Sequence, residues 1–136
     1  MTKEQSLTLI LQLMNNIIFH TNVLPNKLIK LFPPSKKFGM QVNYYRWPPH
    51  SYIPMHDDGH RVAAATIYLN KEWYPNWGGL FLYKRDEDPQ INTFFPSYNC
   101  CVINNNQILH GTSAVTSEAQ DRETVQVFWY ERSDVK

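Results

Sequence analysis

An imidazole and a carboxylate stand two residues apart at the end of a strand-like segment, as His56 and Asp58. In an extended strand, residues i and i+2 point to the same side, with their Cα atoms about 6.6 Å apart. We therefore expect His56 and Asp58 to point together and Asp57 to face away. Such a pair could ligate a metal ion, but a His-x-Asp triplet is also a common polar turn, and the pair alone leaves both interpretations open.

A third candidate ligand, His110, lies on a later strand-like segment and is followed by a turn. Strands that are distant in the sequence can lie side by side in a β-sandwich, so His110 could join His56 and Asp58. Two imidazoles and one carboxylate that leave coordination positions open are typical of non-haem Fe(II) sites. This donor set strengthens the interpretation as a metal site.

Arg122 begins the last strand-like segment, in which several apolar residues follow it. A guanidinium in an interior position needs a carboxylate partner, because an unpaired buried charge is costly. One interpretation is that a bound dicarboxylate is that partner, held by bidentate hydrogen bonds. The other is a solvated strand start, with Arg122 paired to a neighbouring carboxylate from this list: Glu118, Asp121 and Glu123.

Eight short segments rich in β-forming residues are available to position these side chains. Clusters of Pro, Gly, Asn and Asp separate them, and no helical pattern intervenes. Eight such strands predict a mainly β protein, with the jelly roll as the natural double-sheet solution. The segments are residues 38–46, 51–57, 61–69, 79–84, 91–95, 99–104, 107–111 and 123–131.

The beginning of the chain has a different pattern. Apolar residues recur at helical spacing over residues 3–19, which predicts an amphipathic helix that packs on one sheet. Prolines then interrupt the chain before the first strand-like segment. We expect a single domain over residues 1–136, with helical support in 1–37 and the β core in 38–131.

The composition is that of a globular protein, with 43% hydrophobic and 14% aromatic residues among 136. A net charge of +1 gives no electrostatic footprint for nucleic acid or an anionic membrane. No apolar run is long enough to span a bilayer, and no signal peptide is recognisable at the start. Cys100 and Cys101 are adjacent, so a disulfide between them would be strained and we expect reduced thiols. These features predict a cytoplasmic monomer with neither nucleic-acid nor membrane partners.

In combination, the motifs resemble the prolyl-hydroxylase branch of the 2-oxoglutarate/Fe(II)-dependent oxygenases, and most of all the oxygen-sensing prolyl hydroxylases. The likeness runs from about Phe38 to Tyr130, most of the chain. The motifs that carry it are, in order, His56-x-Asp58, Arg61 ahead of Tyr68-Leu69-Asn70, the Gly78-Gly79 turn, and the distal His110 and Arg122.

The resemblance implies a double-stranded β-helix and a dioxygenase that uses Fe(II), 2-oxoglutarate and O2, with ascorbate as a candidate reductant. Arg122 would bind the distal carboxylate of 2-oxoglutarate, and Tyr68 would donate its hydroxyl to the same group. Tyr45 and Tyr52 would line the cosubstrate pocket. The iron ligands that it implies are His56, Asp58 and His110.

The chain also departs from this family. The connection between Asp58 and Arg61 is shorter than usual, and the helical portion before the β core is smaller. Both changes predict an open mouth, which suits an extended chain, so a prolyl residue in a peptide or protein is the leading substrate. The aromatic loop Trp73–Trp77 is the candidate contact for the proline ring, and His60 is a candidate contact at the rim.

Other functions fit parts of the pattern. A hydroxylase of a free amino acid or small metabolite would use the same site. A nucleobase demethylase would carry a second arginine at the position of Phe128. A non-catalytic cupin-like binding module would have His-x-His in place of His56-x-Asp58, and a pseudoenzyme would not need the triad and Arg122 together.

Overall fold

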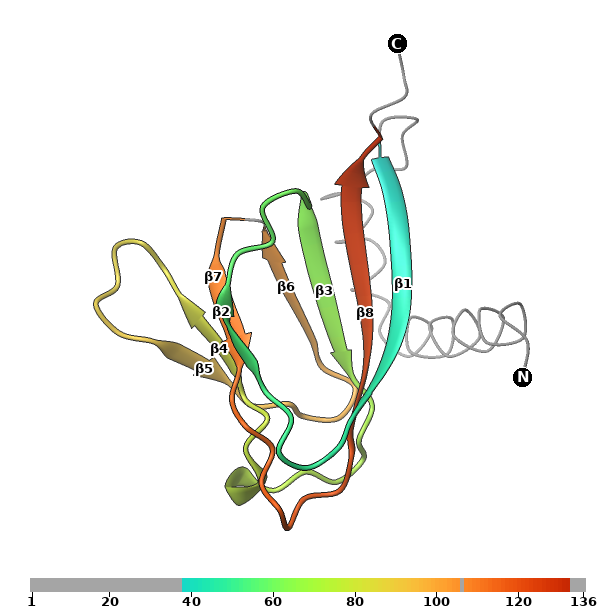
Figure 1. Cartoon of the computed structure of the whole chain (residues 1–136), viewed down its shortest axis with the longest axis vertical. Helices are drawn as coiled ribbons and strands as arrows, with labels where there is room; N and C mark the ends of the chain where they lie inside the picture. The colour runs from blue at the N-terminus through green and yellow to red at the C-terminus, as the bar shows by residue number, and fades with distance from the viewer. Residues whose placement is uncertain (1–37, 106, 133–136) are drawn as a thin grey trace, which may run out of the picture. The chain divides into compact units, whose positions relative to one another are not determined.

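Eight β-strands form two four-stranded sheets in the computed structural model, which describes residues 38–105 and 107–132. The two sheets lie face to face (Figure 1). The first has the order β1 (Phe38–Trp47), β8 (Arg122–Glu131), β3 (Ala63–Tyr68), β6 (Cys101–Asn105). The second has the order β2 (Ile53–His56), β7 (Leu109–Thr112), β4 (Phe81–Lys84), β5 (Asn92–Phe94), with the short 3-10 helix η1 (Pro75–Trp77) before β4.

The prediction of a mainly β fold is confirmed, because each of the eight predicted segments overlaps one strand, with ends that differ by a few residues. The predicted helix over residues 3–19 lies outside the described residues. Within the described ranges, none of the helical segments has the length and apolar character needed to cross a membrane.

The middle of the first sheet is the most deeply buried part of the strands. Every residue of β3, Ala63–Tyr68, is buried, and β3 pairs antiparallel with β6 on one side and with β8 on the other. Thr66 lies opposite Gln126 and Tyr68 lies opposite Thr124 in the β3–β8 register. Because side chains alternate along a strand, Arg122 shares the face of Thr124 and Gln126. The register thus turns Arg122 toward the second sheet.

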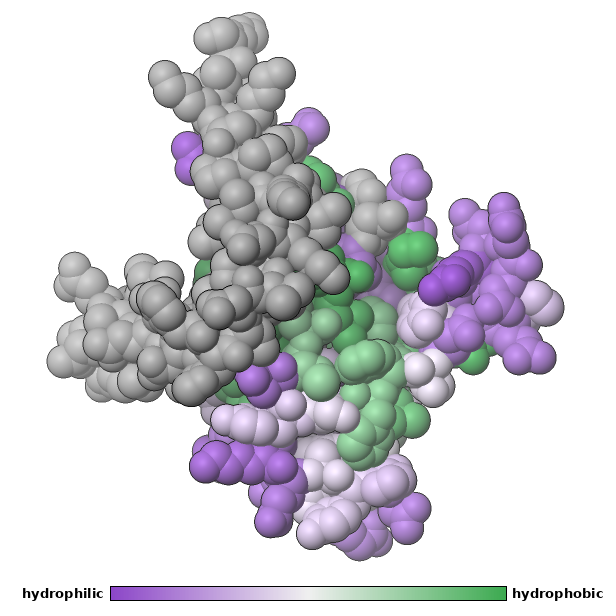
Figure 2. All heavy atoms as spheres, turned by 180° about the vertical axis from the view of Figure 1, so that it is seen from behind, coloured by the Kyte–Doolittle hydropathy of each residue, from purple (hydrophilic) through white to green (hydrophobic). Residues whose placement is uncertain are grey.

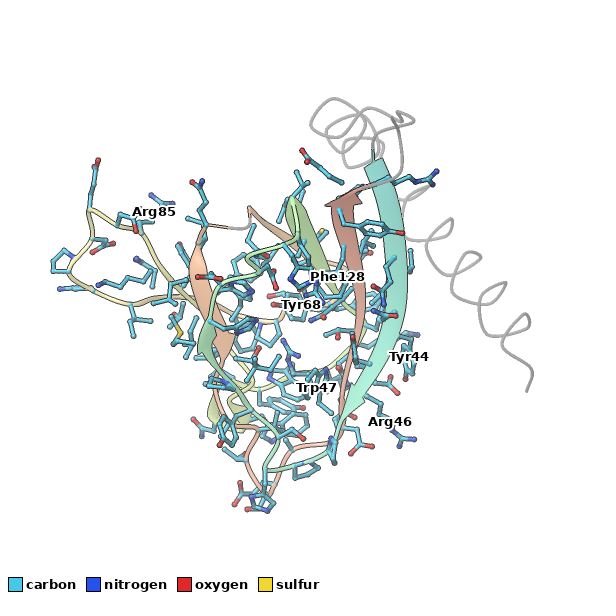
Figure 3. The ribbon with its side chains drawn as sticks, turned by 45° about the horizontal axis from the view of Figure 1, so that its top comes forward. Tyr44, Arg46, Trp47, Tyr68, Arg85 and Phe128 are labelled. Atoms are coloured by element: carbon cyan, nitrogen blue, oxygen red, sulfur yellow. The ribbon has the colours of Figure 1, made fainter. Side chains whose placement is uncertain are left out.

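The space between the sheets holds the polar side chains that matter for chemistry. In Figure 3, Tyr68 and Phe128 lie between the sheets, whereas Tyr44 and Arg46 lie on the outer side of β1. Residues 84–87, from the last residue of β4 onward, are exposed and charged, and the connection to β5 forms the hydrophilic projection of Figure 2. The candidate site therefore lies between the two sheets and not on the β4–β5 hairpin.

Candidate functional site

His56 and His110 are neighbours because β2 pairs with β7. Their Cα atoms are partners in the antiparallel register, and their ring centroids are 4.5 Å apart. Phe81 of β4 stacks on the His110 ring with a centroid distance of 5.6 Å. Three adjacent strands of the second sheet thus fix the two imidazoles side by side.

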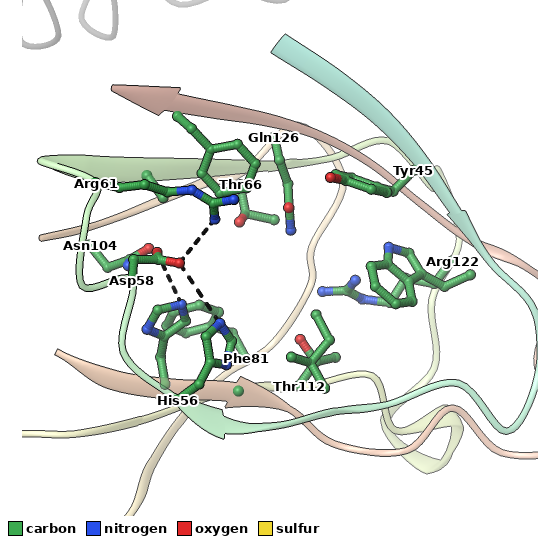
Figure 4. A pocket seen from close by; sticks show the side chains of 16 residues that line it. Tyr45, His56, Asp58, Arg61, Thr66, Phe81, Asn104, Thr112, Arg122 and Gln126 are labelled. Carbon is green, nitrogen blue, oxygen red and sulfur yellow. Dashed lines mark hydrogen bonds and ion pairs between the residues drawn. The ribbon is translucent and has the colours of Figure 1, made fainter. Parts of the chain in front are cut away.

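Asp58 follows β2 directly and brings its carboxylate to the same point. Its side chain is buried, with Oδ1 3.8 Å from His56 Nε2 and Oδ2 3.5 Å from His110 Nε2. One ligand atom from each of the three side chains lies within 4.8 Å of the others. Figure 4 shows His56 and Asp58 pointing toward one another. The structure therefore brings together all three residues that the sequence singled out as metal ligands.

The hydrogen bonds of the two imidazoles suit a metal site. His56 Nδ1 lies 2.9 Å from the carbonyl oxygen of Pro54, and His110 Nδ1 lies 2.7 Å from that of Ile108. A carbonyl oxygen can only accept, so each Nδ1 is the donor in its contact, and Nε2 is the nitrogen left to face Asp58 and a metal ion. Asp58 Oδ2 is a buried oxygen without a hydrogen-bond partner. Two basic nitrogens and an unsatisfied carboxylate oxygen fit a divalent cation such as Fe(II).

Arg122 is a buried cation with 2% of its surface exposed. The alternative interpretation of a solvated strand start does not hold, because Arg122 is buried, no carboxylate in the described ranges forms an ion pair with it, and its Nε has no hydrogen-bond partner. Burial lowers the pKa of the guanidinium, and the nearby Tyr68 opposes that shift. The three carboxylates offered by the sequence are engaged elsewhere: Asp121 with Arg46, Glu123 with Tyr44, and Glu118 with Ser117.

Tyr68 lies against Arg122. The guanidinium carbon is 5.1 Å from the Tyr68 ring centroid, and Tyr68 Oη is a buried hydroxyl without a hydrogen-bond partner. Burial raises the pKa of Tyr68 to about 12, while the charge of Arg122 acts to lower it. The hydroxyl is therefore protonated at neutral pH and able to donate to an anion beside Arg122.

One cavity of about 190 Å³ connects the His-Asp-His cluster with Arg122. Tyr45 lines it as predicted, but Tyr68 and Tyr52 are not among its lining residues, and Tyr52 is 64% exposed. The structure therefore does not bring Tyr52 into the site. The remaining lining residues, which the sequence analysis did not assign to the site, are Trp47, Ile53, Arg61, Ala64, Thr66, Phe81, Asn104, Gly111, Thr112, Gln126 and Phe128.

Strand periodicity was the signal that could have found several of these residues. Thr112 stands two residues after His110, and Gln126 stands four residues after Arg122, so each shares a strand face with a recognised site residue. The contact of Arg61 had no such signal. Its Nη1 lies 3.0 Å from Asp58 Oδ1 and its guanidinium carbon lies 3.7 Å from the centroid of the Phe128 ring.

The Trp73–Trp77 loop does not line the cavity, and its role as a contact for the substrate ring stays a prediction. Trp73 is buried, donates from Nε1 to the Gly78 carbonyl oxygen at 2.9 Å, and packs with Val115 and Ala119. Figure 1 places η1 at the end of the sheets opposite the connection that follows β2. The loop closes the far end of the fold, and His60 is likewise outside the lining.

Gly79 lets the chain pass close to Arg122, which gives a testable prediction. Its φ is 64°, and a Cβ there would lie 2.9 Å from Arg122 Cδ and 3.2 Å from Trp73 Cζ2. Gly79→Ala should lower the free energy of unfolding by about 2–6 kcal/mol, because left-handed backbone strain and overpacking each cost about 1–3 kcal/mol. Urea unfolding followed by tryptophan fluorescence measures this difference.

Gly59→Ala is the matched control for Gly79→Ala. Gly59 also has positive φ, but its nearest neighbour would be Asp57 Oδ1 at 3.5 Å, an ordinary contact. Gly59→Ala should therefore cost only about 1–2 kcal/mol for the left-handed backbone. Equal losses in the two variants would contradict the close packing of Gly79 on Arg122.

A protein-family model described as the 2OG-Fe(II) oxygenase superfamily matches residues 40–131. No curated protein matches this chain. Among solved structures, an oxidoreductase of the 2OG-Fe(II) oxygenase family from Burkholderia pseudomallei is 20% identical, with a TM-score of 0.63 over 76% of this chain and 50% of that one. The residues that the family model matches include the strands that carry the candidate site.

Two further solved structures are prolyl hydroxylases. That of a Pseudomonas putida prolyl-4-hydroxylase is 19% identical, with a TM-score of 0.61 over 71% of this chain and 54% of that one. A Trichoplax adhaerens prolyl hydroxylase in complex with a peptide of hypoxia-inducible factor is 15% identical, with a TM-score of 0.61 over 68% and 44%. The chain spans about half the length of these structures. At such identities the likeness shows a shared fold.

Proposed function

Because the chain belongs to the 2OG-Fe(II) oxygenase superfamily, we propose that it catalyses a hydroxylation that depends on Fe(II) and 2-oxoglutarate. One observation carries this proposal: the His-Asp-His cluster and a buried arginine without a carboxylate partner in the described residues line the same cavity. A dicarboxylate that reaches from the metal to Arg122 would satisfy both ends of the cavity. A non-catalytic binding module would not need a buried arginine that can bind a carboxylate next to a metal site.

His56, Asp58 and His110 would hold the iron, and Arg122 would hold the distal carboxylate of 2-oxoglutarate. When bound, the metal and the cosubstrate supply oxygen activation coupled to oxidative decarboxylation. The protein supplies fixed geometry. The carbonyl oxygens of Pro54 and Ile108 keep both imidazoles in the tautomer that offers Nε2.

The end of the cavity at Arg122 also carries groups that can bind a carboxylate. Tyr68 would donate its hydroxyl to the carboxylate that Arg122 binds, because both groups are buried side by side without other partners for these atoms. Phe81 and Phe128 contribute apolar walls that exclude water from the cavity. Charge and hydrogen-bond donors at one end and metal ligands at the other would orient 2-oxoglutarate in one direction.

The substrate that we favour is a prolyl residue in a peptide or protein. Two of the similar folds are prolyl hydroxylases, and one of them was crystallised with a peptide. The His56 side chain is 40% exposed, so the metal end of the cavity opens to the surface. An open metal end suits an extended chain that remains largely outside, whereas a small metabolite needs a pocket that buries most of its surface.

A turnover assay distinguishes these substrates. With Fe(II), 2-oxoglutarate and O2, proline-rich peptides should gain the mass of one oxygen and yield succinate, while free proline should remain unchanged. The His56→Ala protein, assayed in parallel, controls for adventitious iron. Hydroxylation of free proline without any reaction on peptides would contradict the peptide proposal and leave the oxygenase proposal intact.

A further inference from the structure

Asp58 offers two carboxylate oxygens, and the structure treats them differently. Oδ1 accepts a hydrogen bond from Arg61 Nη1 at 3.0 Å, within an ion pair whose carboxylate side chain is only 4% exposed. Oδ2 is buried without any hydrogen-bond partner. One oxygen is therefore committed to a cation of the protein, and the other remains for a metal ion.

Arg61 is itself held in place from two directions. Its backbone N–H donates to the Asp58 carbonyl oxygen at 2.8 Å, which closes a tight turn through Gly59 and His60. Its guanidinium lies over the Phe128 ring, 3.7 Å from the centroid, so a cation–π contact fixes the other end of the side chain. Figure 4 shows Arg61 reaching over Asp58 from the side of the first sheet. The short connection between Asp58 and Arg61 brings the guanidinium onto the carboxylate.

We propose that Arg61 is a positioning residue that keeps Asp58 a one-oxygen metal ligand. This inference rests on the proposed function. Carboxylates bind metals through one or both oxygens, and a second oxygen from Asp58 would occupy a coordination position that 2-oxoglutarate needs. A charge-assisted hydrogen bond to Oδ1 opposes that rearrangement.

The charge of Arg61 has a separate and opposite effect on metal affinity. A guanidinium beside the site repels a divalent cation and neutralises the carboxylate that attracts it. Removing Arg61 should therefore not weaken metal binding, although it should weaken the binding of 2-oxoglutarate to the metal-loaded protein. A residue that only supported the fold would lower both affinities together, so the separation of the two affinities is the distinguishing sign.

The test compares Arg61→Met, which removes the donor and the charge, with Arg61→Lys, which keeps both. Co(II) is the probe, because the intensity of its visible bands reports coordination number. Arg61→Met should bind Co(II) at least as tightly as the wild type, show altered Co(II) bands, and bind 2-oxoglutarate about 10- to 100-fold more weakly, the usual range for residues that orient metal ligands. Arg61→Lys should restore most of the 2-oxoglutarate affinity and the wild-type bands.

Arg46→Met is the matched control, since Arg46 forms an exposed ion pair with Asp121 away from the cavity. It should leave both affinities and the Co(II) bands unchanged. Should Arg61→Met fail to fold, Phe128→Leu keeps Arg61 but removes the ring beneath it, and should shift the Co(II) bands in the same direction by a smaller amount.

Three results would overturn the inference. The first is a wild-type Co(II) spectrum and wild-type 2-oxoglutarate affinity in Arg61→Met. The second is weaker 2-oxoglutarate binding with an unaltered Co(II) spectrum, which would mean that only the charge matters. The third is a parallel loss of both affinities with a lower melting temperature. If the wild type itself fails to bind Co(II) through His56, the proposed function fails before this inference is reached.

Discussion

Replacing His56 or Asp58 with alanine should abolish metal binding at the site. The three ligand atoms lie within 4.8 Å of one another, and among residues 38–105 and 107–132 no other group of three His, Cys, Asp or Glu side chains lies so close together. Residues that merely orient metal ligands change affinity by about 10- to 100-fold, so the loss of a ligand should exceed about 100-fold. The visible charge-transfer band that Fe(II) and 2-oxoglutarate develop together under anaerobic conditions should disappear.

Anaerobic titration with Fe(II), read by this band and by metal analysis after gel filtration, measures the effect. His60→Ala is the matched control, because His60 is an exposed histidine near Asp58 that does not line the cavity. It should retain the band. If His56→Ala and Asp58→Ala each retained one tightly bound iron, the assignment of the triad as the metal centre would be wrong.

Arg122→Ala should weaken 2-oxoglutarate binding by about 2–5 kcal/mol, the usual effect of truncating one member of a buried charge pair. Arg122 is almost fully buried and lines the cavity that also contains the triad. Its guanidinium has no carboxylate partner in the described part of the chain, so the bound cosubstrate would be its counter-ion. Tyr68→Phe should cost less, about 0.5–1.5 kcal/mol for one hydrogen bond.

Isothermal titration of 2-oxoglutarate into the metal-loaded protein measures both differences, and metal affinity should hardly change in either variant. Stability supplies an independent check. Arg122→Met, which fills a similar volume without a charge, should fold at least as stably as the wild type without cosubstrate, because it removes an unpaired buried cation. Equal 2-oxoglutarate affinity in the wild type and Arg122→Ala would show that the carboxylate anchor is another residue.

The sequence was sufficient for the secondary structure of the β core and for the family. Alternation of side chains and turn-forming clusters are local properties, so each of the eight segments could be predicted as a strand without knowledge of its neighbours. The ordered motifs from His56 to Arg122 indicated the 2-oxoglutarate/Fe(II) oxygenases, and the match over residues 40–131 confirms that family. The helix predicted for residues 3–19 stays a prediction.

The candidate metal ligands show which part of the site the local sequence pattern could predict and which part it could not. His56 and Asp58 could be paired from their spacing, but His110 is distant in the sequence, and only the pairing of β2 with β7 places it opposite His56. Strand pairing over such separations is decided by the packing of the whole fold, so the sequence could propose His110 but could not place it.

Tertiary structure alone decided the orientation and the partners of the other site residues. The register of β8 with β3 places Arg122 on the same inward face as Thr124 and Gln126. The nearby carboxylates of Asp121 and Glu123 contact side chains of β1 instead. The same packing left Tyr52 exposed and placed Trp73 at the far end of the sheets, although both had plausible roles in the sequence. Burial and ion pairing depend on which segments meet in space, and a one-dimensional pattern does not contain that information. The contact of Arg61 with Phe128 is the clearest case, because the turn from Asp58 to Arg61 must meet an aromatic ring of β8 to form it.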